Sequence, residues 1–398
     1  MASLAVLLKL RGHIVSGSDE NVYPPMSDFL AENDVPVNKG FSPENLEPVP
    51  DLVVIGNALS RGNPEVEAIL DLKIPYISMA ELLKEHFIRG KTSLVVTGTH
   101  GKTTTTSMLA WVFETAGKAP GFMIGGIAEN FGTSCRDAKG DLFITEGDEY
   151  DTAFFDKRSK FFHYLPEQLI LNNLEFDHAD IFNSLDEIKK AFRLMLRLIP
   201  KSGLIAANGD DPNVQDVLHS ANSPVIRFGF GESCDVRAEN IITSASGTKF
   251  DIFDKRQGEF SQKQEFELNL AGKYNVLNAL GVITLARHNG ISDRDIQGAF
   301  DSFKCVRRRQ ELLGEVNGIA VYDDFAHHPT AVRETIGAIR QKHADRRIIA
   351  VFEPRSNTSV RRVNQDALID SLLDADVVIL TTPYRVEQIP SEERLDVD

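Results

Sequence analysis

A ten-residue stretch from Val95 to Thr104 constrains the fold of this chain most, because it joins a strand pattern to a helix pattern through a glycine-flanked turn. Residues 93–97 are mostly β-branched or apolar and predict a short buried strand. Residues 102–116 carry apolar side chains at helical spacing. A strand, a glycine turn and a helix in this order point backbone N–H groups and a helix N-terminus at an anion.

The side chains of this turn favour the phosphates of a nucleotide as that anion. Lys102 adds a point charge and Thr103 offers a hydroxyl to Mg²⁺, as in the phosphate-binding pattern G-x-x-x-x-G-K-[ST]. The turn departs from that pattern because Val96 stands where the first glycine is expected. A turn that only begins a helix is the alternative. The residues expected to bind the nucleotide are Gly98, Thr99, His100, Gly101, Lys102, Thr103 and Thr104.

Composition disfavours several other classes of protein. The formal net charge of 43 − 58 = −15 disfavours nonspecific binding of nucleic acid or of an anionic membrane. The three cysteines are widely scattered and form no CxxC pair, so neither disulfides nor a structural zinc site is expected. No apolar run approaches the ~20 residues that cross a bilayer. We expect a soluble, cytoplasmic protein with no nucleic-acid or membrane partner.

The chain of 398 residues is long enough for two to four domains at roughly 150 residues each. Helix and strand patterns alternate along most of it, which predicts the α/β fold class. Polar junctions divide this pattern into three expected domains, 1–88, 89–309 and 310–398. Short alternating runs between residues 236 and 270 predict antiparallel hairpins within the second domain.

In the first domain, two expected strands are each followed by small or polar residues. Parallel sheets bind ligands at the carboxyl ends of their strands. Ser18 and Asp19 follow an expected strand over 13–17, where the carboxylate would accept a hydrogen bond from a ribose hydroxyl. Asn57 and Ala58 follow the second of these strands.

In the second domain, acidic side chains and a histidine stand at the ends of two strands. An expected strand over 142–145 is followed by the acidic turn 146–151, and carboxylates beside a phosphate loop are suited to Mg²⁺. Glu146, nearest the strand, is the expected ligand, and a solvated acidic turn is the alternative. The next strand ends in a segment rich in acids and amides that includes His178, either a metal ligand or a structural histidine.

Three further segments offer contacts to a nucleotide. Asn275 would either cap a helix or hydrogen-bond the edge of an adenine. Arg309 belongs to a run of three arginines, which is either a solvated junction or a partner for a triphosphate. Asp324 precedes a His-His-Pro segment without zinc-ligand spacing, and we interpret this segment as nucleotide or substrate contacts.

Together these segments resemble the Mur ligases, the ATP-dependent amide-forming family of peptidoglycan synthesis. The resemblance extends over essentially the whole chain, and the short phosphate loop is the family's own form. It implies a Rossmann-like UDP-binding domain, a central P-loop ATPase domain and a Rossmann-like C-terminal domain. The segments that carry it are 98–104, 146–151, 173–178, 272–278, 308–309 and 323–330.

The resemblance also implies cofactors and a mechanism. A carboxylate of UDP-N-acetylmuramate would attack the γ-phosphoryl group of ATP, and an amine would then displace phosphate from the acyl phosphate. Lys102, Glu146 and His178 would be catalytic; Thr103 and Glu146 would hold one Mg²⁺, and His178 a second. The strand-end residues of the first domain would hold the UDP-sugar. The residues that would contact ATP outside the turn are Asn275, Arg309 and Asp324.

Two branches of the family remain open from the sequence. One adds L-alanine to UDP-N-acetylmuramate, and the other, in peptidoglycan recycling, adds the murein tripeptide L-alanyl-γ-D-glutamyl-meso-diaminopimelate. The segments 21–27, 155–161 and 353–358 are similar to the recycling branch, which we favour. Arg355 is the expected partner of a peptide carboxylate.

Both ends of the chain are expected to be cut. It opens on a helix with no preceding strand or glycine turn, and it stops soon after an expected strand over 376–381. For that reason an inactive nucleotide-binding fragment, or a P-loop switch, is the alternative of another class. A monomer or a weak dimer is expected.

Overall fold

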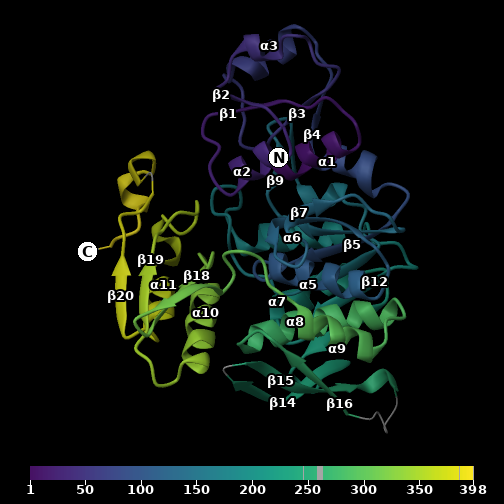
Figure 1. Cartoon of the computed structure of the whole chain (residues 1–398), viewed down its shortest axis with the longest axis vertical. Coiled ribbons are helices and arrows are strands. Elements are labelled where there is room, and N and C mark those ends of the chain that lie inside the picture. Colours follow the sequence, from purple (N-terminus) through teal and green to yellow (C-terminus); the bar gives the residue numbers. More distant parts are fainter. Residues whose placement is uncertain (245, 258–262, 385, 398) are drawn as a thin grey trace.

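The computed structural model describes residues 1–244, 246–257, 263–384 and 386–397; the segment 258–262, inside the expected hairpins, lies outside the described residues. Figure 1 shows a purple N-terminal region, a teal and green central region, and a yellow-green C-terminal region beside the central one. No helix within the described ranges is long and apolar enough to cross a membrane.

The N-terminal region alternates helices with short strands. Strands β1 and β2 form one parallel ladder, and β3 and β4 form another. The helices are α1 (Ala2–Leu10), α2 (Met26–Glu32), α3 (Pro64–Asp71) and α4 (Met79–Leu83), and the strands are β1 (Gly17–Asp19), β2 (Val37–Lys39), β3 (Val53–Ile55) and β4 (Tyr76–Ser78). Leu4 and Leu7 of α1 are buried in a core that also contains Phe143 and Phe161 of the central region. The first region is therefore anchored on the second.

The strand expected over 13–17 is displaced in the structure. The observed strand is Gly17–Asp19, because it pairs with β2, which the sequence analysis missed, in the register Gly17 to Val37. The backbone N–H of Gly17 donates to the carbonyl of Pro36, which fixes the start of this ladder. Ser18 and Asp19 therefore lie inside the strand, at its carboxyl end, rather than after it.

The central region is built on a ten-stranded mixed sheet with the order β16-β15-β14-β13-β12-β11-β5-β8-β6-β7. Its parallel strands are β5 (Thr92–Thr97), β6 (Gly121–Ala128), β8 (Leu142–Gly147), β11 (Gln168–Leu171), β12 (Leu204–Asn208) and β13 (Val225–Gly229). Strand β7 (Thr133–Arg136) pairs antiparallel with β6, and β9 (Asp151–Ala153) pairs with β10 (Asp156–Ser159) in a separate hairpin. Strands β14 (Val236–Ser244), β15 (Gly247–Asp254) and β16 (Gln264–Leu268) pair antiparallel, which confirms the expected hairpins.

Both faces of this sheet are covered. Leu94 and Val96 of β5 face a core that includes α5 (Lys102–Thr115), α8 (Lys273–His288) and α9 (Asp293–Ser302). Val95 faces the opposite core, which includes α6 (Leu185–Leu196) and α7 (Pro212–Val217). Successive strand residues point to opposite faces of a sheet. Strand β5 is therefore buried on both sides, and its carboxyl end is held rigidly.

The Ser292→Ala variant should lower the free energy of unfolding of the central region by about 1 kcal/mol. Ser292 is the N-cap of α9, and its hydroxyl accepts a hydrogen bond from the backbone N–H of Asp295 at 3.2 Å. Urea unfolding monitored by circular dichroism would measure the loss. The exposed Arg294, in the same helical turn, serves as the control, and its alanine variant should change stability by less than about 0.5 kcal/mol. Equal losses in both variants would contradict the capping role.

The C-terminal region has a smaller α/β core. Strands β17 (Glu311–Val316) and β18 (Ile319–Asp323) form an antiparallel hairpin, and β19 (Ile349–Phe352) pairs with β20 (Val377–Leu380) in parallel. Two helices, α10 (Pro329–Lys342) and α11 (Gln365–Leu372), pack against each other and share a core with β19. The core residues are Val332, Ile336, Phe352, Leu368, Leu372 and Leu395. Figure 1 shows α10 on the side of the C-terminal region next to the central region, and His328, at the N-cap of α10, lies 3.2 Å from the carbonyl oxygen of Phe176, so the start of this helix can contribute to a shared site.

Candidate active site

The turn between β5 and α5 has a backbone that requires its two glycines. Gly98 has a φ of +131° and Gly101 a φ of +78°, both in the left-handed region. A Cβ at residue 101 would lie 2.6 Å from Oδ1 of Asn278, so an alanine there would clash as well as strain the backbone. The turn therefore delivers Lys102 at the first position of α5, where free backbone N–H groups face an incoming anion.

Asn173, in the segment after β11, holds the turn in this shape. Its Oδ1 accepts from the backbone N–H of His100 at 2.8 Å, and its carbonyl accepts from the N–H of Thr99 at 3.2 Å. Its Nδ2 donates to the carbonyl of His100 at 3.2 Å. The turn is thus preorganised by a neighbouring strand end.

The ammonium group of Lys102 lies among carboxylates. Its Nζ donates to Oε2 of Glu149 at 2.8 Å and to the carbonyl of Gly98 at 2.7 Å. Burial opposes the charge on Lys102, but the neighbouring carboxylates, Glu149 foremost, raise its pKa above the usual value. The lysine is therefore a charged group, held where the turn meets the acidic segment after β8.

Thr103 and Glu146 form a pair of oxygen donors beside this lysine. The Thr103 hydroxyl donates to Oε2 of Glu146 at 3.0 Å, while Oε1 of Glu146 accepts from the backbone N–H of Gly125. Burial raises the pKa of the Glu146 carboxyl. A hydroxyl and a carboxylate at this spacing fit a hard cation such as Mg²⁺, whose positive charge would favour the ionised form of Glu146.

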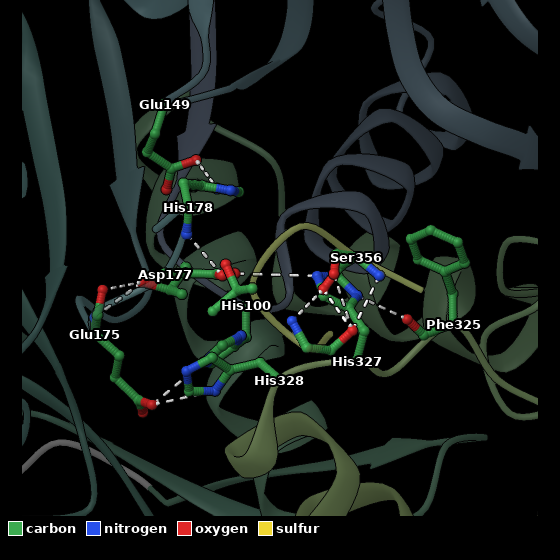
Figure 2. A network of polar contacts seen from close by, with 12 residues as sticks. His100, Glu149, Glu175, Asp177, His178, Phe325, His327, His328 and Ser356 are labelled. Atoms are coloured by element: carbon green, nitrogen blue, oxygen red, sulfur yellow. Dashed lines mark hydrogen bonds and ion pairs between the residues drawn. The ribbon is translucent and has the colours of Figure 1, made fainter. Parts of the chain in front are cut away.

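A second group of donors lies close by, formed by Asp148, Glu149 and His178. One ligand atom from each lies within 4.8 Å of the others. Nε2 of His178 is buried without a hydrogen-bond partner among the described residues, and it lies 3.8 Å from Oε2 of Glu149 (Figure 2). His178 also has a φ of +56°, a strained conformation that clusters at functional sites. An orphaned nitrogen that faces carboxylates fits a divalent cation.

A cavity of about 400 Å³ opens beside the phosphate turn. Its walls come from the central region and from the start of the C-terminal region, including Thr330 and Glu334 of α10. Six residues expected to bind ATP line it: His100, Gly101, Thr104, Asn275, Arg309 and Asp324. A larger cavity of about 580 Å³ lies inside the C-terminal region, but mainly apolar side chains line it and it does not reach the described phosphate turn.

The structure decides the helix-cap alternative for Asn275. Helix α8 begins at Lys273 with Gly272 as its N-cap, so Asn275 lies inside the first turn. Its Nδ2 donates to the carbonyl of Ala271 at 2.8 Å, and its Oδ1 accepts from Nδ2 of Asn278 at 3.4 Å. The capping interpretation is wrong, and both amides are buried at the cavity wall.

One wall of this cavity was not predicted from the sequence. Asn208 ends β12, and Asp210, Asp211 and Asn213 follow it into the cavity lining. Asp211 caps α7 and also accepts from the backbone N–H of Leu174 at 2.9 Å, which ties two strand ends together. The signal was present, because a polar run directly after a parallel strand is the pattern that pointed to Glu146.

Other expected site residues lie elsewhere. Ser18 and Asp19 end β1, Asn57 and Ala58 follow β3, and among the described lining residues of the 400 Å³ cavity none of these four occurs. Arg355 follows β19 and is about half exposed, with Nη1 3.7 Å from Glu353 and its guanidinium 4.5 Å from the ring centre of Tyr384.

The loop that carries Arg355 nevertheless touches the segment after His178. Thr358 accepts from the backbone N–H of Ala179 at 3.2 Å, and Nδ2 of Asn357 donates to Asp180 at 2.7 Å. Thr358 and Ser359 of this loop line a small cavity together with Asp177 and His327, in the part of the structure drawn in Figure 2. The loop after β19 therefore faces the second donor group.

Comparison with known proteins agrees with this architecture. The Mur ligase family, catalytic domain, matches residues 1–90; the Mur ligase middle domain matches 96–286; and the Mur ligase, glutamate ligase domain matches 308–395. The chain belongs to the Mur ligase family, which confirms the resemblance and the three-domain α/β fold.

Individual relatives are more specific. The chain is 46% identical over 387 residues to the UDP-N-acetylmuramate–L-alanyl-γ-D-glutamyl-meso-2,6-diaminoheptandioate ligase of Escherichia coli strain K12. The aligned residues cover 97% of this chain and 83% of the relative. The chain is 34% identical over 386 residues to the UDP-N-acetylmuramate–L-alanine ligase of Acidithiobacillus ferrooxidans, with 96% and 81% covered. The crystal structure of a murein peptide ligase from Psychrobacter arcticus superimposes with a TM-score of 0.80 at 39% identity, over 97% of this chain and 83% of that one.

Proposed function

We propose that this protein is a cytoplasmic, ADP-forming ligase that joins L-alanyl-γ-D-glutamyl-meso-diaminopimelate to UDP-N-acetylmuramate in peptidoglycan recycling. The observation that supports this choice most is the difference in identity to the two kinds of relative. It is 46% to the tripeptide ligase and 34% to the L-alanine ligase over nearly the same span. The UDP-sugar would bind to residues 1–88, ATP to 89–309 and the peptide to 310–398.

ATP would occupy the cavity of about 400 Å³, with its terminal phosphates on the turn 98–104. Lys102 would contact the γ-phosphate as a fixed positive charge, since phosphoryl transfer depends mainly on position and electrostatics. Asn275 would hydrogen-bond the adenine, and Arg309 and Asp324 would contact the remainder of the nucleotide.

Thr103 with Glu146 would hold one Mg²⁺, and His178 with Asp148 and Glu149 would hold a second. When bound, Mg²⁺ would neutralise charge on the transferring phosphoryl group. The protein side chains would set the positions of the reactants. Lys102 lies near carboxylates of both groups of donors, and its pairing with Glu149 would hold the phosphate turn against them.

The reaction would proceed in two steps. A carboxylate oxygen of UDP-N-acetylmuramate attacks the γ-phosphorus, the bond to ADP breaks, and ADP leaves. The α-amine of the tripeptide then attacks the acyl carbon, phosphate leaves and the amine loses a proton. Ser18, Asp19, Asn57 and Ala58 would hold the UDP-sugar. Arg355 would pair with a peptide carboxylate from a loop that adjoins the metal donors.

Purified protein with ATP, Mg²⁺ and UDP-N-acetylmuramate should release phosphate at least about tenfold faster, by kcat/KM, with the tripeptide than with L-alanine. Protein side chains that pair with the extra carboxylates of the tripeptide are left unpaired when L-alanine binds. Mass spectrometry of the product would confirm peptide transfer. A preference for L-alanine would assign the protein to the other branch. Tight ATP binding without phosphate release with either substrate would contradict ligase function.

A further inference from the structure

Three side chains outside the proposed magnesium donors meet where the phosphate turn touches the C-terminal region. His100 comes from the turn, Glu175 from the segment after β11, and His328 from the N-terminus of α10. In Figure 2 the rings of His100 and His328 lie next to each other, and the carboxylate of Glu175 points toward both. The ring centres are 4.3 Å apart.

The distances between their ligand atoms match those of a tetrahedral metal site. Oε2 of Glu175 lies 3.4 Å from Nε2 of His100 and 3.5 Å from Nδ1 of His328. One ligand atom from each of the three residues lies within 4.8 Å of the others. Nitrogen and oxygen ligands about 2.0–2.2 Å from a tetrahedral zinc ion are themselves roughly 3.3–3.6 Å apart, the range in which the two distances to Glu175 fall.

The proton on His328 is fixed on the nitrogen that faces away from Glu175. Nε2 of His328 lies 3.2 Å from the carbonyl oxygen of Phe176, which only accepts, so Nε2 carries the hydrogen. Nδ1 accepts from the backbone N–H of Thr330 at 3.3 Å.

Oε2 of Glu175 lies 3.5 Å from Nδ1 of His328, the same nitrogen that accepts from the backbone N–H of Thr330. Capping of α10 explains why Nδ1 of His328 accepts from Thr330, but it does not explain why a carboxylate faces the same nitrogen.

The outer partners are those of a metal site. A backbone carbonyl holds the far nitrogen of His328, and the Thr330 hydroxyl donates to Oε2 of Glu175 at 2.6 Å. Such outer contacts orient metal ligands and set the histidine tautomer. Two imidazoles and one carboxylate form a donor set typical of zinc with one position open.

We propose that His100, Glu175 and His328 bind one zinc-class transition-metal ion, and that this ion fastens the C-terminal region to the phosphate turn. The site is separate from Asp148, Glu149 and His178. Its formation requires the docked arrangement of the two regions and no ligase turnover, although His100 and Glu175 also line the cavity proposed for ATP.

Cobalt(II) titration of the metal-free full chain, in saturating Mg²⁺ to fill the hard-cation donors, tests this site. The absorption spectrum should indicate one tetrahedral cobalt ion per chain, and zinc should displace it. The His328→Asn variant should weaken cobalt binding by about tenfold or more, because it removes a ligand, while asparagine can still cap α10. The matched control His178→Asn should bind cobalt with an affinity within about threefold of the parent.

Thermal unfolding of each variant would show that the C-terminal region remains folded. A second variant, Glu175→Gln, keeps the size of the side chain and removes its charge, and it should weaken cobalt binding as His328→Asn does. Cobalt binding that is lost in the His178 variant but kept in the other two would place the ion in the other donor group and overturn the proposal. An octahedral spectrum, or no binding at millimolar cobalt, would also overturn it.

Discussion

The Lys102→Ala variant should lose phosphate release and peptide transfer by about 10²–10³-fold. The lysine is the charge that the phosphate turn presents at the start of α5, and the proposed reaction gathers negative charge at that point. Because the lysine also pairs with the buried carboxylate of Glu149, the variant leaves that carboxylate unpaired and should be less stable. Single-turnover assays at saturating ATP would separate the chemical step from ATP binding.

Lys118→Ala is the matched control for this variant. Lys118 is an exposed lysine just after the other end of α5, and its removal should leave turnover within about twofold of the parent. Thermal unfolding of both proteins would separate a loss of stability from a loss of chemistry. Undiminished ligation by folded Lys102→Ala protein would refute the proposed role of the phosphate turn.

The Glu146→Gln variant should lower turnover by about 10²-fold and raise the Mg²⁺ concentration needed for half-maximal activity. The substitution keeps the shape of the side chain, so the contacts with Thr103 and the Gly125 N–H can persist. The substitution removes the negative charge and replaces one carboxylate oxygen with an NH₂ group, so the cation loses both a charge and a donor atom. Initial rates across a Mg²⁺ titration give both quantities.

Glu129→Gln provides the comparison, because Glu129 lies just after the same strand β6 as Gly125 and pairs with Arg307 at the surface. Its turnover and Mg²⁺ dependence should stay within about threefold of the parent values. An unchanged Mg²⁺ dependence in Glu146→Gln would show that Glu146 is not a metal ligand.

Local patterns predicted the centre of the fold well. The helix expected over 102–116 is observed as Lys102–Thr115, because its apolar spacing and the preceding glycine turn are both encoded within a few residues. The antiparallel strands after residue 236 were predicted for the same reason. Strand β6 was missed because Gly125 and Gly126 interrupt its apolar pattern, although they fit tightly against Glu146 and Val306. Strand β2 was also missed, because it is only three residues long and is a strand only through its pairing with β1.

Some residues of the candidate site could likewise be predicted from the sequence, and others could not. Strand-end residues such as Glu146 and His178 could be selected because a parallel sheet brings its carboxyl ends together. The contact of Glu175 with His328 could not be predicted, because it depends on how α10 docks against the central region. These residues are far apart in the sequence: the neighbouring contact between His328 and Phe176 spans 152 positions. The sequence predicted only nucleotide or substrate contacts for the His-His-Pro segment. It did not predict that the ring of His328 packs beside His100 of the phosphate turn.

The walls of the cavity beside the phosphate turn belong to two separately cored parts of the chain, with Asn278 on one side and Glu334 on the other. A molecule that contacts both walls makes all of its interactions only while the two parts are docked. Its binding free energy therefore also stabilises the docked arrangement of the two parts. With a ligand in the cavity, the two parts should therefore unfold in a single cooperative transition. Without a ligand, the smaller C-terminal part can unfold first.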